Sequence, residues 1–133
     1  MILRLIVITP DAAIVDEANI VNSLFEHGLQ RLHVRKPSFT LADYQQYFLG
    51  IDEQWYHKIV VHNSYELYHQ YHLGGIHLNS FARESGKVWE QLKGVPAHAL
   101  SASFHSWKEI EDNDFRYGYV FISPVFDSIS KVG

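Results

Sequence analysis

The sequence predicts an α/β fold in which repeated strand–helix units are arranged around a parallel sheet. Short apolar runs rich in β-branched residues alternate with longer stretches of amphipathic spacing along the chain. Proline and glycine fall only at the boundaries of these stretches, and no linker or low-complexity tract divides them. Polar residues gather directly after the apolar runs, at the sheet edge where α/β proteins bind their ligands.

Six strands are expected from the apolar runs. They lie at residues 3–8, 31–35, 58–61, 75–78, 97–100 and 117–122. The first run passes directly into Thr9 and Pro10, which end a strand. The later runs are short, and they are separated by the amphipathic stretches that a parallel connection requires.

Five helices are expected between these strands. They lie at residues 14–26, 41–48, 65–71, 87–92 and 107–113. A glycine follows each of the first four helices, namely Gly28, Gly50, Gly74 and Gly94. The second and fifth helices begin with capping-pair spacing, in Thr40 with Asp43 and in Ser106 with Glu109.

Composition and charge narrow the classes of function. Among 133 residues, 11 Lys and Arg face 15 Asp and Glu, which gives a net charge of −4 with scattered positive residues. This pattern argues against partners such as nucleic acid or an anionic membrane. The chain has no cysteine, which excludes disulfides and thiol catalysis, and no run approaches the roughly 20 apolar residues that span a bilayer. We expect a cytoplasmic protein with a small-molecule partner. The sequence does not decide whether the protein forms a homo-oligomer.

The carboxyl ends of the expected strands carry the polar side chains of a candidate site. These residues are Thr9, Arg35, Lys36, His62, Asn63, His77, Asn79, Ser80, Ser101, Ser103, His105 and Ser123. The two common glycine-rich nucleotide motifs, GxGxxG and GxxxxGK[ST], are absent. The gathering of polar residues at the carboxyl ends of the strands therefore locates a site, but it does not identify the chemistry of that site.

The chain length leaves two architectures open. A complete (β/α)8 barrel needs eight strand–helix units in about 200 to 250 residues. Six strands in 133 residues fit either an open doubly wound sheet or the first part of a barrel.

Several strand-end segments, taken in order, favour the barrel. They are residues 32–37, 59–64, 74–78, 103–106 followed by Glu109, and 118–126 leading into 128–131. Together they resemble the thiamine-phosphate synthase/TenI family. The resemblance implies a (β/α)8 TIM barrel of thiamine biosynthesis with only its first six strands present in this chain. Residues 1–133 are therefore expected to form a single barrel domain that lacks the last two βα units.

One branch of this family joins a pyrimidine diphosphate to a thiazole phosphate and releases pyrophosphate. By resemblance, the phosphate-binding side chains are Arg35, Ser128, Ser130 and Lys131. The synthases hold Mg²⁺ with two aspartates, because a hard cation prefers carboxylate oxygens. Here His62-Asn63 replaces the family's Asn-Asp pair, and residues 79–82 contain no carboxylate at the second position. Asn63 thus occupies a family metal position, and no metal ligand is assigned.

The other branch aromatises a thiazole phosphate by moving a proton, a reaction that requires no metal or other cofactor. Histidine suits this chemistry because its ordinary pKa lies near neutral pH. His105 matches the TenI-type catalytic histidine, and His33 with Arg35 resembles the family's His-x-Arg pattern. We therefore favour a TenI-like thiazole tautomerase, with a Mg²⁺-dependent synthase and a non-catalytic phosphate-binding regulatory barrel as alternatives.

On this hypothesis His105 is catalytic. The expected substrate-binding residues are His33, Arg35, Lys36, His62, Asn63, His77, Ser103, Ser128, Ser130 and Lys131. Structural roles compete for two of them: Asn63 has capping spacing for the third helix, and His77 alternates with apolar neighbours like a core histidine. The ligand is a thiazole phosphate, joined in the synthase alternative by a pyrimidine diphosphate.

Overall fold

The computed structural model describes residues 4–123 and contains six strands within that range. They are β1 (Ile6–Ile8), β2 (Arg31–Val34), β3 (Ile59–Val61), β4 (Gly75–Leu78), β5 (Leu100–Phe104) and β6 (Tyr119–Ile122). Neighbouring strands follow each other in sequence order, and the pairs β1–β2, β2–β3, β3–β4 and β5–β6 are parallel. This sequential order is that of a (β/α) barrel, whereas a doubly wound sheet reverses its order. The predicted fold class is confirmed.

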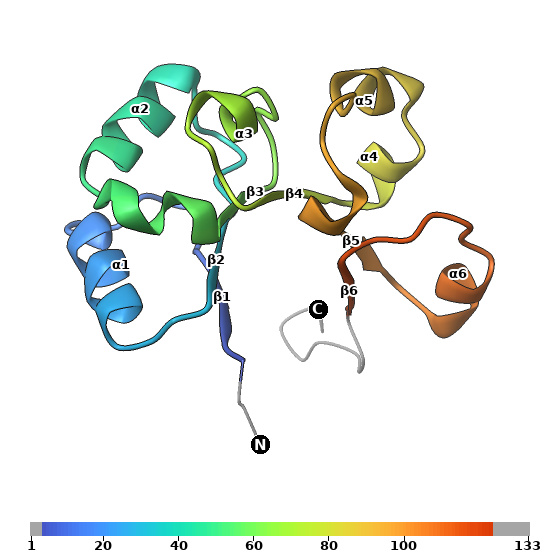
Figure 1. Cartoon of the computed structure of the whole chain (residues 1–133), viewed down its shortest axis with the longest axis horizontal. Coiled ribbons are helices and arrows are strands. Elements are labelled where there is room, and N and C mark those ends of the chain that lie inside the picture. The colour runs from blue at the N-terminus through green and yellow to red at the C-terminus, as the bar shows by residue number, and fades with distance from the viewer. Residues whose placement is uncertain (1–3, 124–133) are drawn as a thin grey trace, which may run out of the picture. The chain divides into compact units, whose positions relative to one another are not determined.

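The helices connect successive strands along the chain (Figure 1). The α-helices are α1 (Glu17–Glu26), α2 (Leu41–Leu49), α3 (Leu67–Gln70), α4 (Ser80–Arg83), α5 (Gly86–Gln91) and α6 (Trp107–Glu111). Two 3₁₀ turns, η1 (Glu53–Lys58) and η2 (Ala97–Ala99), precede β3 and β5. Among the described residues, no helix is both long and apolar enough to cross a membrane.

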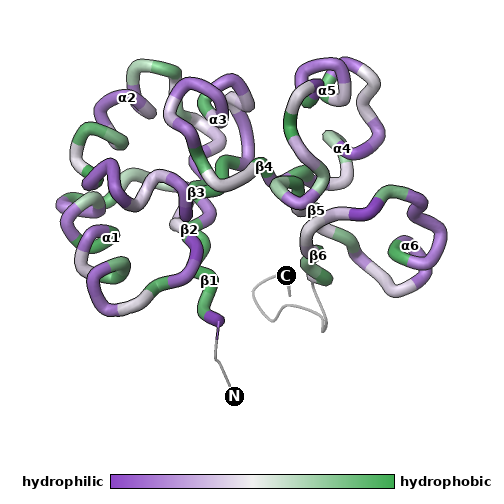
Figure 2. The backbone as a smooth tube through the Cα atoms, viewed as in Figure 1, coloured by the Kyte–Doolittle hydropathy of each residue, from purple (hydrophilic) through white to green (hydrophobic). Residues whose placement is uncertain are grey.

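The chain divides within β4 into two compact units, Met1–Ile76 and His77–Gly133. In the first unit, α1 buries Val21 and Phe25, and α2 buries Tyr44 and Phe48. All three residues of β3 are buried, and the ring of Phe25 stacks on that of Trp55. In Figure 2, β1 and β3 are coloured as hydrophobic, whereas α1 and α2 mix hydrophobic and hydrophilic residues. Burial of these apolar faces is the main force that holds the unit together.

The second unit has a smaller core. β5 buries Leu100, Ala102 and Phe104, and the guanidinium of Arg83 lies 3.9 Å from the centre of the Phe104 ring. Its helices are short: α4 has four residues, α5 six and α6 five. Neither α5 nor α6 has a buried residue, so side-chain caps and loop contacts carry much of their stability.

Two glycines show where the backbone packs tightly. A Cβ on Gly74 would lie 2.3 Å from the carbonyl oxygen of His57, and a Cβ on Gly118 would lie 2.3 Å from that of His98. Gly74 precedes β4 in the same way that Gly118 precedes β6. The close approach of backbone to backbone explains the glycine at both positions.

Most predicted elements exist, with corrected bounds. The expected strand at 97–100 is wrong, because residues 97–99 form η2 and the strand begins at Leu100. Small polar residues fill that strand and hide its β pattern in the sequence. The third helix covers Leu67–Gln70, not 65–71, and α4 was not predicted. Both predicted caps are confirmed: Thr40 and Asp43 form a reciprocal pair, and the Ser106 hydroxyl accepts the backbone N–H of Glu109.

Candidate functional site

The predicted site residues fall into two groups, one in each unit. His33, Arg35, Lys36, His62 and Asn63 belong to the first unit, and His77, Ser103 and His105 belong to the second. Ser128, Ser130 and Lys131 lie outside the described residues. Each group has its own internal hydrogen-bond network, and the two networks differ in exposure.

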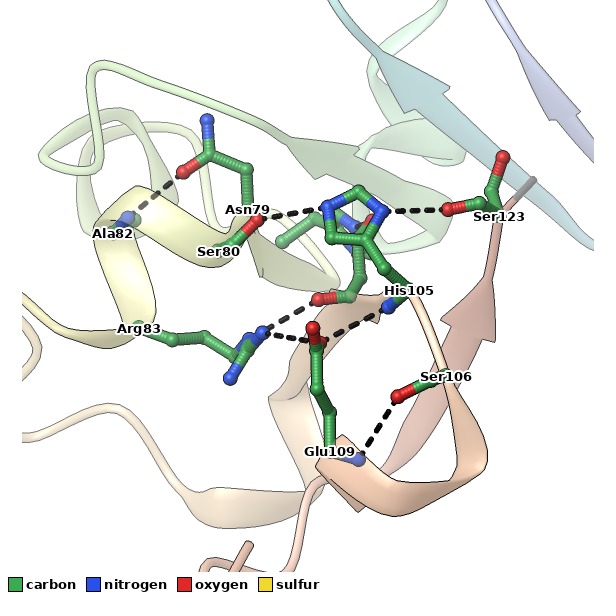
Figure 3. A network of polar contacts seen from close by, with 10 residues as sticks. Asn79, Ser80, Ala82, Arg83, His105, Ser106, Glu109 and Ser123 are labelled. Carbon is green, nitrogen blue, oxygen red and sulfur yellow. Dashed lines mark hydrogen bonds and ion pairs between the residues drawn. The ribbon is translucent and has the colours of Figure 1, made fainter. Parts of the chain in front are cut away.

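His105 is an exposed residue directly after β5, and both of its ring nitrogens are hydrogen-bonded (Figure 3). Nδ1 lies 2.8 Å from the carbonyl oxygen of Ser123, and Nε2 lies 3.1 Å from the hydroxyl of Ser80. A carbonyl oxygen can only accept, so Nδ1 carries the proton of the neutral ring. Nε2 is then the basic nitrogen, and the Ser80 hydroxyl donates to it.

A carboxylate fixes the loop that carries His105. Glu109 on α6 accepts the backbone N–H of His105 at 3.0 Å and forms an ion pair with Arg83 at 3.4 Å. The hydroxyl of Ser106 accepts the backbone N–H of Glu109 at 3.2 Å, which caps α6. Arg83 also donates from Nε to the carbonyl oxygen of Ser103 at 3.1 Å. The ring of His105 is thus held by Ser80 of α4 and by Ser123 directly after β6, and its backbone is held by Glu109 of α6 (Figure 3).

A cavity of about 390 Å³ lies next to this network. Ser80, Arg83 and Glu109 line it, together with Glu84, Asp112, Asn113 and Asp114. Ser80 was predicted at the end of a strand without a role, and Arg83 was not predicted as a site residue. No motif marks Arg83, because its contacts depend on the packing of α4 against β5.

His77 is buried between two serines of β5. Its Nδ1 lies 2.7 Å from the hydroxyl of Ser101, and its Nε2 lies 2.7 Å from the hydroxyl of Ser103. The ring also contacts that of Phe121, with 5.0 Å between the centres. Because both of its ring nitrogens are hydrogen-bonded, His77 is interpreted as a structural histidine of the core, and Ser103 is one of its two partners.

In the first unit, two histidines contact each other. Nδ1 of His33 lies 2.8 Å from Nε2 of His62, with the rings nearly perpendicular. His33 is wholly buried, and burial together with the positive charge of Arg35 lowers the pKa of His62 to about 4. His62 is therefore neutral near pH 7, and one ring donates to the other.

Lys36 lies in a buried cage of acceptors. Its ammonium donates to the carbonyl oxygens of Pro10 and Ala12 and to the carboxylate of Glu17, each at 2.7 Å. The hydroxyl of Tyr47 donates to the same carboxylate, and burial with the Glu17 charge raises the pKa of Tyr47. An ammonium with three protein acceptors holds the loop after β1, so this geometry favours a structural role over the expected substrate contact.

The last two predicted residues of the first unit have partners as well. The guanidinium of Arg35, about half exposed, pairs with the carboxylate of Asp11. The hydroxyl of Tyr44 donates to the side-chain oxygen of Asn63, and burial raises the pKa of Tyr44 to about 12. Asn63 does not cap the third helix, because α3 begins after Glu66 without a side-chain cap. That capping interpretation was wrong.

The residues at the family's metal positions do not suit Mg²⁺. The oxygen of Asn63 accepts from Tyr44, and the oxygen of Asn79 accepts the backbone N–H of Ala82 at 2.8 Å. Neither position offers a carboxylate, although Mg²⁺ is usually held by one or two. No step through a metal is derived from this donor set.

Comparison with solved structures finds a similar protein. The structure is similar to the crystal structure of thiamine phosphate pyrophosphorylase from Bacteroides thetaiotaomicron, with a TM-score of 0.77 and 34% sequence identity. The match covers 92% of this chain and 59% of the other. No protein-family model matches the chain, and a search of curated proteins found no match.

Proposed function

Taking the chain as a member of a thiamine-phosphate synthase/TenI-like family, as the structural match supports, we propose that it is a TenI-like thiazole tautomerase. His105 moves the proton that aromatises a thiazole phosphate. The observation that carries this proposal is the orientation of its ring, with Nδ1 held by the carbonyl of Ser123 and Nε2 left as the basic nitrogen. A positioned imidazole transfers protons efficiently near neutral pH.

The surrounding residues suit a proton-transferring histidine. When Nε2 takes a proton, the ring becomes an imidazolium whose Nδ1–H still donates to the carbonyl oxygen of Ser123. Glu109 fixes the backbone of His105, so the ring does not have to be reoriented during the reaction.

A phosphate contact by Arg35 stays a prediction by resemblance; its guanidinium is about half exposed and pairs with Asp11. Substrate contacts by His33, Lys36, His62, Asn63, His77 and Ser103 stay predictions, and their internal hydrogen bonds favour supporting roles. Ser128, Ser130 and Lys131 keep their proposed phosphate contacts by resemblance. The proposal includes a cytoplasmic location and a small-molecule ligand.

Replacing His105 tests the proposal. His105→Asn should lower kcat for thiazole phosphate aromatisation by about 10² to 10⁴, the range that a general acid–base group contributes. Binding of the thiazole phosphate should persist, measured by calorimetry on the same protein. His98→Asn is the matched control, since His98 is an exposed histidine of the same unit outside the network. Undiminished turnover by His105→Asn would remove His105 from the mechanism.

A synthase is the second candidate, because the structural match at 34% identity is to a protein named thiamine phosphate pyrophosphorylase. In this case the protein releases pyrophosphate from a pyrimidine diphosphate and a thiazole phosphate in the presence of Mg²⁺. The two activities are separated by assaying aromatisation without metal and pyrophosphate release with it. Tight binding of the thiazole phosphate with neither activity would favour the regulatory alternative.

A further inference from the structure

Ser80 stands between the basic nitrogen of His105 and the cavity of the second unit. Its hydroxyl lies 3.1 Å from Nε2 of His105, and the same residue lines the cavity of about 390 Å³. His105 itself is not among the residues that line the cavity. A ligand in this cavity therefore lies against Ser80, the residue whose hydroxyl contacts Nε2 of His105.

The tautomer of His105 determines what this hydroxyl can do. Nδ1 keeps its proton against the carbonyl of Ser123, so the Ser80 hydroxyl donates its hydrogen to Nε2. The lone pairs of the serine oxygen are then available to accept a second hydrogen. This is the arrangement of a two-step proton relay, with a donor–acceptor distance in the range used for proton transfer.

We propose that Ser80 is a further catalytic residue of the reaction, relaying the proton between His105 and the ligand. The ligand gives a proton to the Ser80 oxygen while the serine proton moves to Nε2 of His105. The serine is unchanged, the imidazole becomes an imidazolium, and the electron pair stays on the ligand. The reverse transfer returns a proton to the ligand at another atom, which completes the tautomerisation.

The charge of the cavity indicates which end of the ligand approaches Ser80. Four carboxylates, from Glu84, Glu109, Asp112 and Asp114, surround a single guanidinium from Arg83. A dianionic phosphate would be repelled there, whereas an uncharged or cationic heterocycle would not. The ring of the thiazole phosphate is therefore the part that meets the hydroxyl, and its phosphate is bound elsewhere.

Ser80 can be replaced without removing the helix cap. Asn79 caps α4 by accepting the backbone N–H of Ala82, and Ser80 is the first residue of the helix. Alanine is a good helix former, so Ser80→Ala should keep α4 in place. Loss of activity in this variant would then report the hydroxyl and not the fold.

This inference rests on the tautomerase proposal, and the experiment separates the two. The wild-type chain, His105→Asn, Ser80→Ala and Ser80→Thr are assayed for kcat and KM on thiazole phosphate between pH 5 and 9. We expect Ser80→Ala to lose at least about tenfold in kcat with little change in KM, and the hydroxyl of Ser80→Thr to restore most of it. The shape of the pH profile should persist in Ser80→Ala, because His105 is still present.

Ser85→Ala is the matched control. Ser85 lies five residues after Ser80 and caps α5, so Ser85→Ala should lower the thermal stability slightly and leave kcat unchanged. An inactive wild-type protein would overturn the tautomerase proposal and the relay with it. An active wild-type protein with inactive His105→Asn and fully active Ser80→Ala would overturn the relay alone. A Ser80→Thr variant as impaired as Ser80→Ala would also count against it.

Discussion

The two units use their polar residues in different ways. In the first unit, His33 contacts His62, and Lys36 is enclosed by the Glu17 carboxylate and two carbonyl oxygens. In the second unit, His105 is exposed, and its partners are a serine hydroxyl and a carbonyl oxygen beside a cavity. Buried groups that satisfy each other hold a fold, whereas an exposed and oriented base can exchange protons with a ligand.

His77 shows that a unit need not treat all of its histidines alike. It lies in the second unit, yet it is 2% exposed and both of its ring nitrogens meet serine hydroxyls. The distinction therefore follows burial and partner type, not residue type. Replacing a structural group should lower the free energy of unfolding, whereas replacing a catalytic group should lower activity.

The largest effect is expected at Lys36. Lys36→Met keeps the length of the side chain but leaves the buried Glu17 carboxylate without its counter-ion, so the free energy of unfolding should fall by about 3 to 5 kcal/mol. Lys108→Met is the control, since Lys108 pairs with Asp112 on the surface and should change stability by at most about 0.5 kcal/mol. Urea denaturation measures both. Equal small effects would show that Lys36 is not a structural residue.

A pH-dependent effect of nearly the same size is expected at His62. In the folded protein the pKa of His62 is about 4, below its ordinary value of 6.5. At a pH between these two values, the unfolded state therefore binds a proton that the folded state does not bind. The stabilising contribution is complete above pH 6.5 and is lost as the pH falls toward 4, by about 3 kcal/mol in all. His62→Gln should remove this contribution.

The measurement compares wild type and His62→Gln at each pH, so that the titration of carboxylates cancels. The difference in unfolding free energy between the two proteins should shrink as the pH falls from 7 to 4. His98→Gln, which changes an exposed histidine, should follow the wild-type slope. A constant difference for His62→Gln would mean that His62 is not desolvated in the folded protein.

The sequence predicted the strands of the first unit better than those of the second. Ile59–Val61 is continuously β-branched and buried, which is the clearest signal that a parallel strand gives. Leu100–Phe104 contains Ser101 and Ser103, whose place in a strand depends on the imidazole of His77 beside them. A partner on another strand is a tertiary contact that local periodicity does not encode.

The sequence predicted where the site residues lie along the chain better than it predicted which groups they contact. His105 was identified from resemblance, but its tautomer depends on Ser123 and Ser80, which are distant in sequence. Lys36 shared its prediction with Arg35 because both are basic. Alternation along β2 does not separate them, because Leu32, His33 and Val34 are all buried and both faces of the strand are covered. The acceptors that enclose Lys36 come from the loop after β1 and from α1, and these tertiary contacts could not be predicted from the sequence.

The smallest effects on stability are expected from replacing the two helix caps. One replacement should act on the whole protein and the other only locally. Thr40 and Asp43 cap α2, which buries Tyr44 and Phe48, so Thr40→Ala should lower the global free energy of unfolding by about 1 kcal/mol. Ser106 caps α6, which buries no residue, so Ser106→Ala should loosen that helix locally.

Hydrogen exchange distinguishes a global from a local effect. In Thr40→Ala, the slowest-exchanging amides should lose protection by about fivefold, the equivalent of 1 kcal/mol, because they exchange by global unfolding. In Ser106→Ala, faster exchange should be confined to α6 and the His105 loop, since Glu109 would no longer be fixed by the cap. An equal loss of protection throughout both units would mean that α6 is as firmly integrated as α2. The contrast drawn between a closed structural network and an open catalytic one would then fail.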